Sequence, residues 1–290
     1  MTLLSPHALF VALLSWVWAA PTFAQSPVPT SAPTPAPVNT QPAPATAPQA
    51  ISGPSHPWVV AAPRLRKEAY FSNLADGDTI DTPYLVKFGL TGMGLAPIVA
   101  PVAGTGHHHL LINRDLPLDF NKPLPFNDQY IHFGKGQMET VLNLAPGAYQ
   151  LRLVLADEKH IPNFVFSKPL HVIVKRKRPG VDPKSLVVPG VAVLAPGAGE
   201  TVKPPFRVAL HASGLNVSST ALKEKGTGHF RVKLKPEGAP EVVLPLTNGF
   251  TELWLSPPPG AYTVSVEFID NTQAERVLAT GPATAFRVER

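Results

Sequence analysis

The sequence contains no cysteine among its 290 residues. This absence excludes disulfide bonds, thiolate metal ligands, a cysteine nucleophile and a lipid-modified cysteine. An exported protein of this composition must therefore be stabilised by its core alone. Long hydrophobic runs are missing too. Beyond the N-terminus no segment approaches the roughly 20 apolar residues of a membrane-crossing helix, so we expect no transmembrane span in the mature chain.

Positive charge is not arranged in a way that predicts a nucleic-acid partner. The formal net charge is +5, but basic and aromatic residues are not interleaved, so we expect no binding to nucleic acid. The densest basic run, residues 175–178, falls where we expect a joint between two domains, and such runs are commonly solvated.

The N-terminus has the pattern of a secretory signal peptide. Residues 8–20 are apolar but too short to span a bilayer comfortably, and Thr22-Phe23-Ala24 is a small-x-small cleavage pattern. We therefore predict a signal peptide over residues 1–24 and a soluble, periplasmic or secreted protein. An uncleaved N-terminal anchor is the alternative. Residues 25–62 are rich in Pro, Ala and Thr and predict a disordered linker.

The rest of the chain predicts short β-strands separated by turns. Tyr149, Leu151, Leu153 and Leu155 alternate with other residues and so lie on one face of a strand. We find no segment with helical periodicity, and the fold class expected is all-β, with two tandem Ig-like β-sandwich domains. In the first domain the predicted strands are residues 69–73, 84–90, 108–113, 139–144, 149–156 and 170–175.

An internal repeat divides the chain. Residues 83–88 match 205–210, residues 104–107 match 226–229 at the same offset, and residues 146–149 match 259–262 after a shorter loop. The repeat predicts a His-rich domain over residues 63–178, a linker over 179–190, and a diverged second domain over 191–290. The Pro-Gly-Ala-Tyr sequence in both copies resembles the tyrosine corner of Ig-like folds.

Three adjacent histidines, His107, His108 and His109, begin an apolar run in the first copy. In a strand, His107 and His109 emerge on one face and His108 on the other. The matching strand of the second copy indicates that His107, His109 and Leu111 face outward, whereas His108 faces the core. We expect His108 to be buried with a backbone partner.

The histidines that the second copy lacks predict a metal site. His109 corresponds to Arg231, and His132 and His160 also have no histidine counterpart. Imidazole is a common ligand for zinc and copper, so we predict a Cu or Zn site. The predicted ligands are His107, His109, His132 and His160. Residues expected to support this site or to bind a ligand are His108, Lys135, Gln137, Glu139, Asp157 and Met93.

Five segments of the first domain resemble a bacterial exported family, domain of unknown function 4399. They lie within residues 70–174 and are 71–78, 87–94, 105–112 (Thr-Gly-His-His-His-Leu-Leu-Ile), 132–137 (His-Phe-Gly-Lys-Gly-Gln) and 157–162 (Asp-Glu-Lys-His-Ile-Pro). The family tends to show Thr where Met138 stands and another His near Asn163. The resemblance implies an exported protein with a shared site and implies no particular activity.

Three hypotheses for function follow. The first is a periplasmic, non-catalytic binding protein whose His-rich site holds a divalent metal. The second is a cell-envelope module that binds an anion, a polymer or a protein, with the histidines as a hydrogen-bonded network. The third is a metal-dependent hydrolase, which a three-histidine site with an open position would permit. The sequence shows no strand-turn-helix serine nucleophile and no cysteine, so we do not expect an enzyme.

Overall fold

A computed structural model of the protein describes residues 56–63, 67–117 and 119–290. These residues belong to one compact unit, Thr46–Arg290. The predicted signal peptide (1–24) and the predicted linker up to residue 55 lie outside the described residues. The described part is all-β, as predicted, with one short 3-10 helix. Its elements are β1 (Val59–Val60), β2 (Glu68–Phe71), β3 (Thr79–Thr82), β4 (Tyr84–Thr91), β5 (Gly94–Leu95), β6 (Thr105–Ile112), β7 (Tyr130–His132), β8 (Glu139–Leu142), β9 (Gly147–Ala156), β10 (Pro162–Phe166), β11 (Leu170–Lys177), η1 (Pro183–Leu186), β12 (Gly190–Ala195), β13 (Thr201–Val202), β14 (Phe206–Ser213), β15 (Asn216–Val217), β16 (Thr227–Pro236), β17 (Val242–Pro245), β18 (Glu252–Leu255), β19 (Gly260–Asp270), β20 (Val277–Thr280) and β21 (Thr284–Val288).

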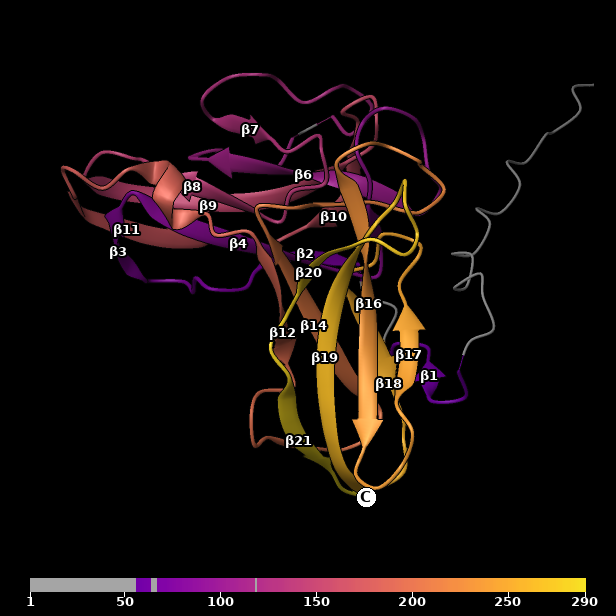
Figure 1. The fold of residues 1–290 in the computed structure, drawn as a ribbon. Coiled ribbons are helices and arrows are strands. Elements are labelled where there is room, and N and C mark those ends of the chain that lie inside the picture. Colours follow the sequence, from indigo (N-terminus) through magenta and orange to yellow (C-terminus); the bar gives the residue numbers. More distant parts are fainter. Residues whose placement is uncertain (1–55, 64–66, 118) are drawn as a thin grey trace, which may run out of the picture. The chain divides into compact units, whose positions relative to one another are not determined.

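The first copy of the repeat is a sandwich of a small and a large sheet (Figure 1). The small sheet has the order β2-β4-β8, and the large sheet has the order β3-β11-β9-β6-β5, with β10 added on β9 and β7 on β6. The six strands predicted for this copy are confirmed, with shifts of a few residues at their ends. The short strands β3, β5, β7 and β10 were not predicted, because two to five residues carry too little alternation to be recognised.

The second copy repeats this topology. Its large sheet has the order β13-β21-β19-β16-β15, with β17 on β16 and β20 on β19, and its small sheet has the order β1-β18-β14-β12. Both predicted tyrosine corners are present. The Tyr149 hydroxyl donates to the carbonyl of Ala145 at 3.0 Å, and the Tyr262 hydroxyl donates to the carbonyl of Pro258 at 2.7 Å. Each bond reaches back along the chain and ties the start of a long strand to the loop before it.

Apolar side chains between the two sheets of each copy form the core. In the first copy Phe88 and Leu110 are fully buried, and in the second copy Phe230 and Phe268 are. Leu110 thus lies on the core side of its strand, the side predicted for His108 two residues before it.

One finding concerns the predicted linker. Val59 and Val60 lie inside the predicted disordered linker, yet they form β1, which pairs with β18 of the second copy. Two β-branched residues next to Trp58, which packs against the core, suffice for this short pairing. No helix among the described residues is long and apolar enough to cross a membrane.

Candidate metal centre

The central strand β6 places two histidines on the same face of the large sheet. It lies between β9 and β7, with His107 opposite Ala156 and His109 opposite Val154. On its other edge His109 is directly opposite His132 of β7. Directly opposite residues of an antiparallel pair project to the same side. The register of β7 therefore brings the third histidine to the other two.

A tight turn after β9 delivers the fourth histidine. His160 has a left-handed backbone with φ of 64°, which is uncommon for a residue other than glycine. The Asp157 side chain accepts hydrogen bonds from the backbone N–H groups of Lys159 (2.9 Å) and Ile161 (2.8 Å) on either side of it. Asp157, predicted to bond a ligand ring, thus acts on the backbone instead and holds the turn in which His160 sits.

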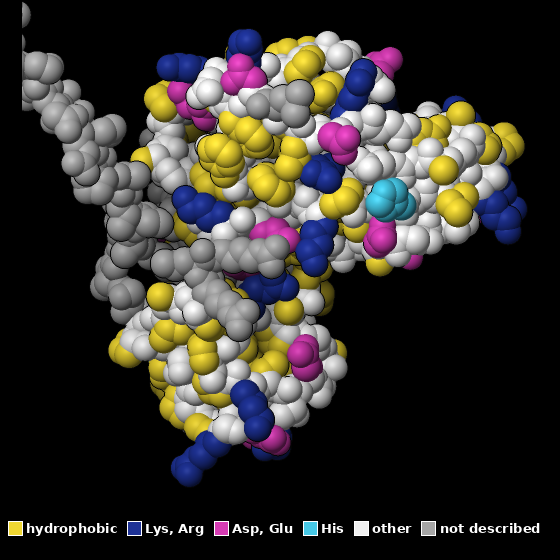
Figure 2. All heavy atoms as spheres, turned by 180° about the vertical axis from the view of Figure 1, so that it is seen from behind, with side chains coloured by type: hydrophobic (Ala, Val, Ile, Leu, Met, Phe, Trp, Pro, Cys, Tyr) yellow, Lys and Arg dark blue, Asp and Glu magenta, His cyan; other side chains and the backbone are white. Residues whose placement is uncertain are grey.

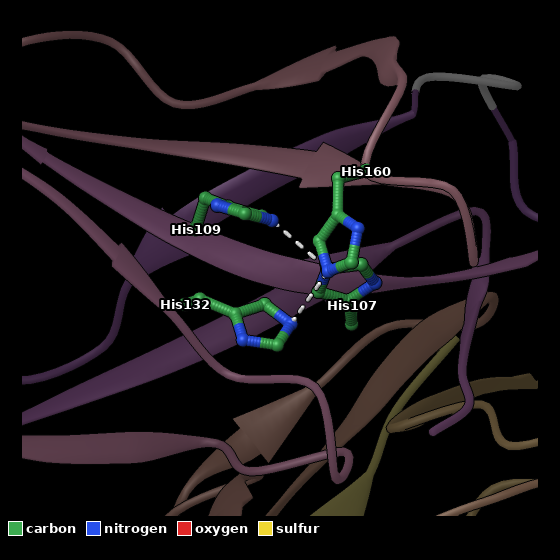
Figure 3. Close-up of side chains that lie close together, drawn as sticks. All are labelled: His107, His109, His132 and His160. Atoms are coloured by element: carbon green, nitrogen blue, oxygen red, sulfur yellow. Dashed lines mark hydrogen bonds between the residues drawn. The ribbon is translucent and has the colours of Figure 1, made fainter. Parts of the chain in front are cut away.

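The four imidazoles converge on one another (Figure 3). The Nε2 atoms of His107 and His109 are 2.9 Å apart, and those of His132 and His160 are 3.2 Å apart. One potential ligand nitrogen from each of the four residues lies within 4.8 Å of all the others. Four nitrogens around a tetrahedral zinc ion at 2.0–2.1 Å would be about 3.3 Å apart. The cluster could therefore hold a metal ion with small ring movements.

The site is largely shielded from water, and this favours the neutral form of His107, His109 and His132. His107 and His109 are buried, and His132 and His160 are half-buried. Burial, followed by the neighbouring imidazoles, lowers the pKa of His107 to about 2 and that of His109 to about 3. Burial and His160 also lower the pKa of His132. Neutral imidazole is the form that coordinates metals, so this environment favours binding at neutral pH.

The outer face of β6 is covered rather than exposed. Leu111, on the same face as His107 and His109, packs with Leu124 and Val154 in a small second core. Leu124 belongs to the long segment between β6 and β7. The predicted outward orientation of this face is confirmed, and the segment between β6 and β7 folds back over it. On the face drawn in Figure 2, histidine accounts for only one small patch.

His108 faces the core, as predicted, but the expected backbone partner is absent. Its ring is fully buried beside Phe88, with the centroids 5.5 Å apart. Neither ring nitrogen has a hydrogen-bond partner among the described residues. Burial lowers the pKa of His108 to about 3. The His108 ring thus packs in the apolar core in its neutral form and does not belong to the cluster.

Four other predicted supporting residues do not reach the cluster. Glu139 accepts hydrogen bonds from His211 and Ser213 of the second copy, so the prediction that it orients a ligand histidine is wrong. Burial opposes ionisation of Glu139, but the bonds from His211 and Ser213 outweigh it and lower its pKa. Gln137 and Glu139 line a separate cavity of about 190 Å³. Lys135 is exposed, its backbone N–H donating to Gln137, and Met93 lies in the core.

Three residues near the cluster were missed from the sequence. Phe126 is 63% exposed and lies over His132 and His160, with ring centroids at 5.3 and 4.8 Å. Gly134 leaves room for the His132 ring, which a Cβ at this position would meet at 2.4 Å. Glu158 and His107 both line a cavity of about 10 Å³, the size of a single water. The two glycines that flank Lys135 indicate a close backbone approach and could have pointed to Gly134. Phe126 lies in an irregular loop, where no sequence pattern indicates its position.

The second copy uses the same positions differently. His229, the counterpart of His107, is bonded to Asn271, with its Nδ1 2.8 Å from the side-chain oxygen. Arg231, the counterpart of His109, forms an ion pair with Glu267. Among the described residues, the one group of histidines and acidic residues placed to hold a metal is the cluster in the first copy.

The fold and the cluster together define an Ig-like β-sandwich protein with a histidine group that could hold a metal. Residues 86–175 match the family described as Domain of unknown function (DUF4399). This confirms the resemblance of the first domain, and the match does not extend to the second copy. No curated protein matches the chain.

Matches among solved structures include fibronectin-type modules. The fibronectin(III)-like modules of Clostridium thermocellum CbhA are 14% identical, with 76% of this chain and 92% of that chain covered and a TM-score of 0.25. The chicken CNTN1 FN1–FN3 domains are 10% identical, with 75% and 68% covered and a TM-score of 0.22. Dimeric latent PorU from Porphyromonas gingivalis is 13% identical, with 76% of this chain and 20% of that chain covered and a TM-score of 0.28. Similarities at this level carry no argument about function.

Proposed function

We propose that the protein is an exported, non-catalytic metal-binding protein whose first domain holds one Cu(II) or Zn(II) ion at His107, His109, His132 and His160. The N-terminal sequence pattern supports export to the periplasm or the medium. A chain without cysteine would have to bind such an ion through imidazole, which suits both metals.

The convergence of four imidazoles from three segments carries this proposal. One nitrogen of each ring lies within 4.8 Å of the others. Clustering four basic rings without an anion is unfavourable as soon as any of them is protonated. A divalent cation coordinated by neutral rings turns this arrangement into a favourable one, since each ring contributes a lone pair.

The envelope-module hypothesis has one observation in its favour. The pairs His107–His109 and His132–His160 are at hydrogen-bond distance, as a structural network requires. However, the Nδ1 atom of His109 is buried and has no partner among the described residues. A metal bound at Nε2 would leave this atom unpaired too, so it does not separate the two hypotheses. We prefer the metal hypothesis because the two hydrogen bonds join the rings only in pairs, whereas one ion would bind a nitrogen of all four.

Isothermal titration calorimetry tests the proposal on untagged protein. The parent should bind Zn(II) or Cu(II) in a ratio of one to one, and His109→Gln and His132→Gln should each weaken binding at least ten-fold. Glutamine keeps much of the volume of histidine, so the buried position is not emptied. His229→Gln in the second copy is the matched control and should bind as the parent does.

Two results would contradict the metal hypothesis. One is a parent that binds neither ion more tightly than micromolar, and the other is a His109→Gln variant that binds like the parent. Export is tested separately by intact-mass measurement of the periplasmic protein, which should begin at Gln25. A membrane-bound form that retains Met1 would refute export without affecting the metal site.

A further inference from the structure

The two copies contact each other through residues that correspond in the repeat. Glu139 accepts hydrogen bonds from the Ser213 hydroxyl at 2.7 Å and from the Gly214 backbone N–H at 3.0 Å. Its counterpart Glu252 accepts a hydrogen bond from the Thr91 hydroxyl at 3.0 Å. Thr91 occupies the position in the first copy that Ser213 occupies in the second. Each glutamate thus reaches the same strand position of the other copy.

Backbone hydrogen bonds repeat this reciprocity. The N–H of Leu95 donates to the carbonyl of Gly249 at 2.8 Å, and the N–H of Val217 donates to the carbonyl of Gly136 at 2.9 Å. Leu95 corresponds to Val217, and Gly136 corresponds to Gly249. The two bonds are therefore the two halves of one contact related by an approximate two-fold axis.

The glycines at these contacts are required on both sides. A Cβ on Gly136 would lie 2.0 Å from the carbonyl oxygen of Val217, and a Cβ on Gly249 would lie 2.2 Å from that of Leu95. Both copies have thus kept the same glycine for the same close approach to the other copy.

We propose that this surface is a self-complementary interface whose partner is a second copy of the same fold. In this chain the linker between the copies is long enough for the first copy to pair with the second copy of the same molecule. When the linker is too short to span that distance, the first copy of one molecule pairs with the second copy of another. A contact in which residue i of one copy meets residue j of the other, and j meets i, is the signature of an isologous interface.

Two residues specific to one copy favour pairing of a first copy with a second copy. The Nε2 of His211 donates to Glu139 at 2.9 Å, and the first copy has Gly89 at the position of His211. Arg207 of the second copy lies over the Tyr70 ring of the first copy, with its guanidinium carbon 5.3 Å from the ring centroid. Two first copies would lack both interactions, so exchange between chains should be reciprocal and should close as a dimer.

The linker can be made too short without removing any strand. Arg178, after β11, donates its backbone N–H to Thr82, next to the start of β4. Gly190 lies opposite Ser213 in the second copy, and the Ser213 hydroxyl donates to Glu139. Glu139 in turn lies opposite Lys87, which is further along β4, so Gly190 starts near that end of the strand. From Tyr84 to Lys87 the strand rises about 10 Å. Deleting residues 179–188 leaves one residue between Arg178 and Gly190, which spans about 7 Å.

The experiment is size-exclusion chromatography with light scattering on four proteins. They are the parent, the deletion of residues 179–188, a control in which the same ten residues are replaced by glycine and serine, and the deletion combined with Thr91→Glu and Ser213→Glu. The two added glutamates face Glu252 and Glu139 and should repel them. Circular dichroism checks that each protein keeps its β-sheet signal.

The deletion should double the mass per particle relative to the parent, and the glycine–serine control should keep the parent's mass. The two glutamates should return the deletion protein to the mass of a single chain. The proposal is overturned by a deletion protein of unchanged mass or by one that loses its β-sheet signal. It is also overturned by association that the two glutamates leave unaffected.

Discussion

Arg231 and Glu267 form an ion pair of 2.6 Å in the second copy, at the positions that His109 and Val154 hold in the first. The same pair of strands therefore supports either an ion pair or half of a histidine cluster. The first copy buries this face beneath Leu124 and its neighbours and places histidine rings there. In the second copy the carboxylate of Glu267 is also largely buried, and Arg231 and Lys233 offset its charge.

Gly134→Ala should weaken metal binding by at least ten-fold. The added Cβ would lie 2.4 Å from the Nε2 and Cε1 atoms of His132, so the ring has to leave its place. Calorimetry with Zn(II) measures the effect. Gly190→Ala is the matched control, because a Cβ there meets nothing within 4 Å, and its affinity should equal that of the parent. Equal affinities of both variants would show that His132 is not a ligand.

Asp157 should act on metal binding through the backbone of His160. Asp157→Ala removes the acceptor for two N–H groups of the turn and should weaken binding by about ten-fold, the scale found for residues that orient ligands. Asp157→Asn keeps a side-chain oxygen and should restore most of the affinity. If both variants lost affinity equally, the charge of Asp157 rather than its hydrogen bonds would be what matters.

His108→Phe should stabilise the protein and leave metal binding unchanged. Both ring nitrogens of His108 are buried without a partner, which costs about 1–3 kcal/mol, and phenylalanine removes them. The second copy has Phe230 at this position, packed against Phe268. Urea unfolding of the metal-free protein measures the change. A lower free energy of unfolding would mean that the ring has a partner, such as an ordered water.

Acid should destabilise the metal-free protein because His107 and His109 are neutral when folded. Their folded-state pKa values, about 2 for His107 and about 3 for His109, lie below the unfolded value of about 6.5. Their contribution to stability is thus fully present above about pH 6.5 and is lost as the pH falls toward the folded values. Each histidine contributes a slope of about 1.4 kcal/mol per pH unit.

Urea unfolding at pH 7.5 and at pH 5.5 measures this loss. The midpoint of the parent should fall clearly between the two, and that of a His107→Gln/His109→Gln variant should fall less. Equal pH dependence of the two proteins would show that these rings are protonated in the folded state.

The sequence predicts the sheets and the grouping of the four histidines well because both follow from local patterns. Alternation predicts the long strands, and the loss of His109, His132 and His160 from the second copy distinguishes them from structural histidines. The partner of Glu139 was not predictable, because His211 lies 72 residues away in the other copy. Neither the packing of Leu124 over β6 nor the left-handed backbone of His160 was predictable. Both lie in irregular loops, whose sequences lack the periodic alternation that identifies strands.

The four histidines of the cluster come from three separate segments, β6, β7 and the turn after β9. A bound ion would thus act as a cross-link that joins both ends of the long loop between β6 and β7. Because the chain has no cysteine, such an ion would provide a constraint that disulfides provide in other proteins. Loading with metal should accordingly make this loop more resistant to proteases than it is in the metal-free protein.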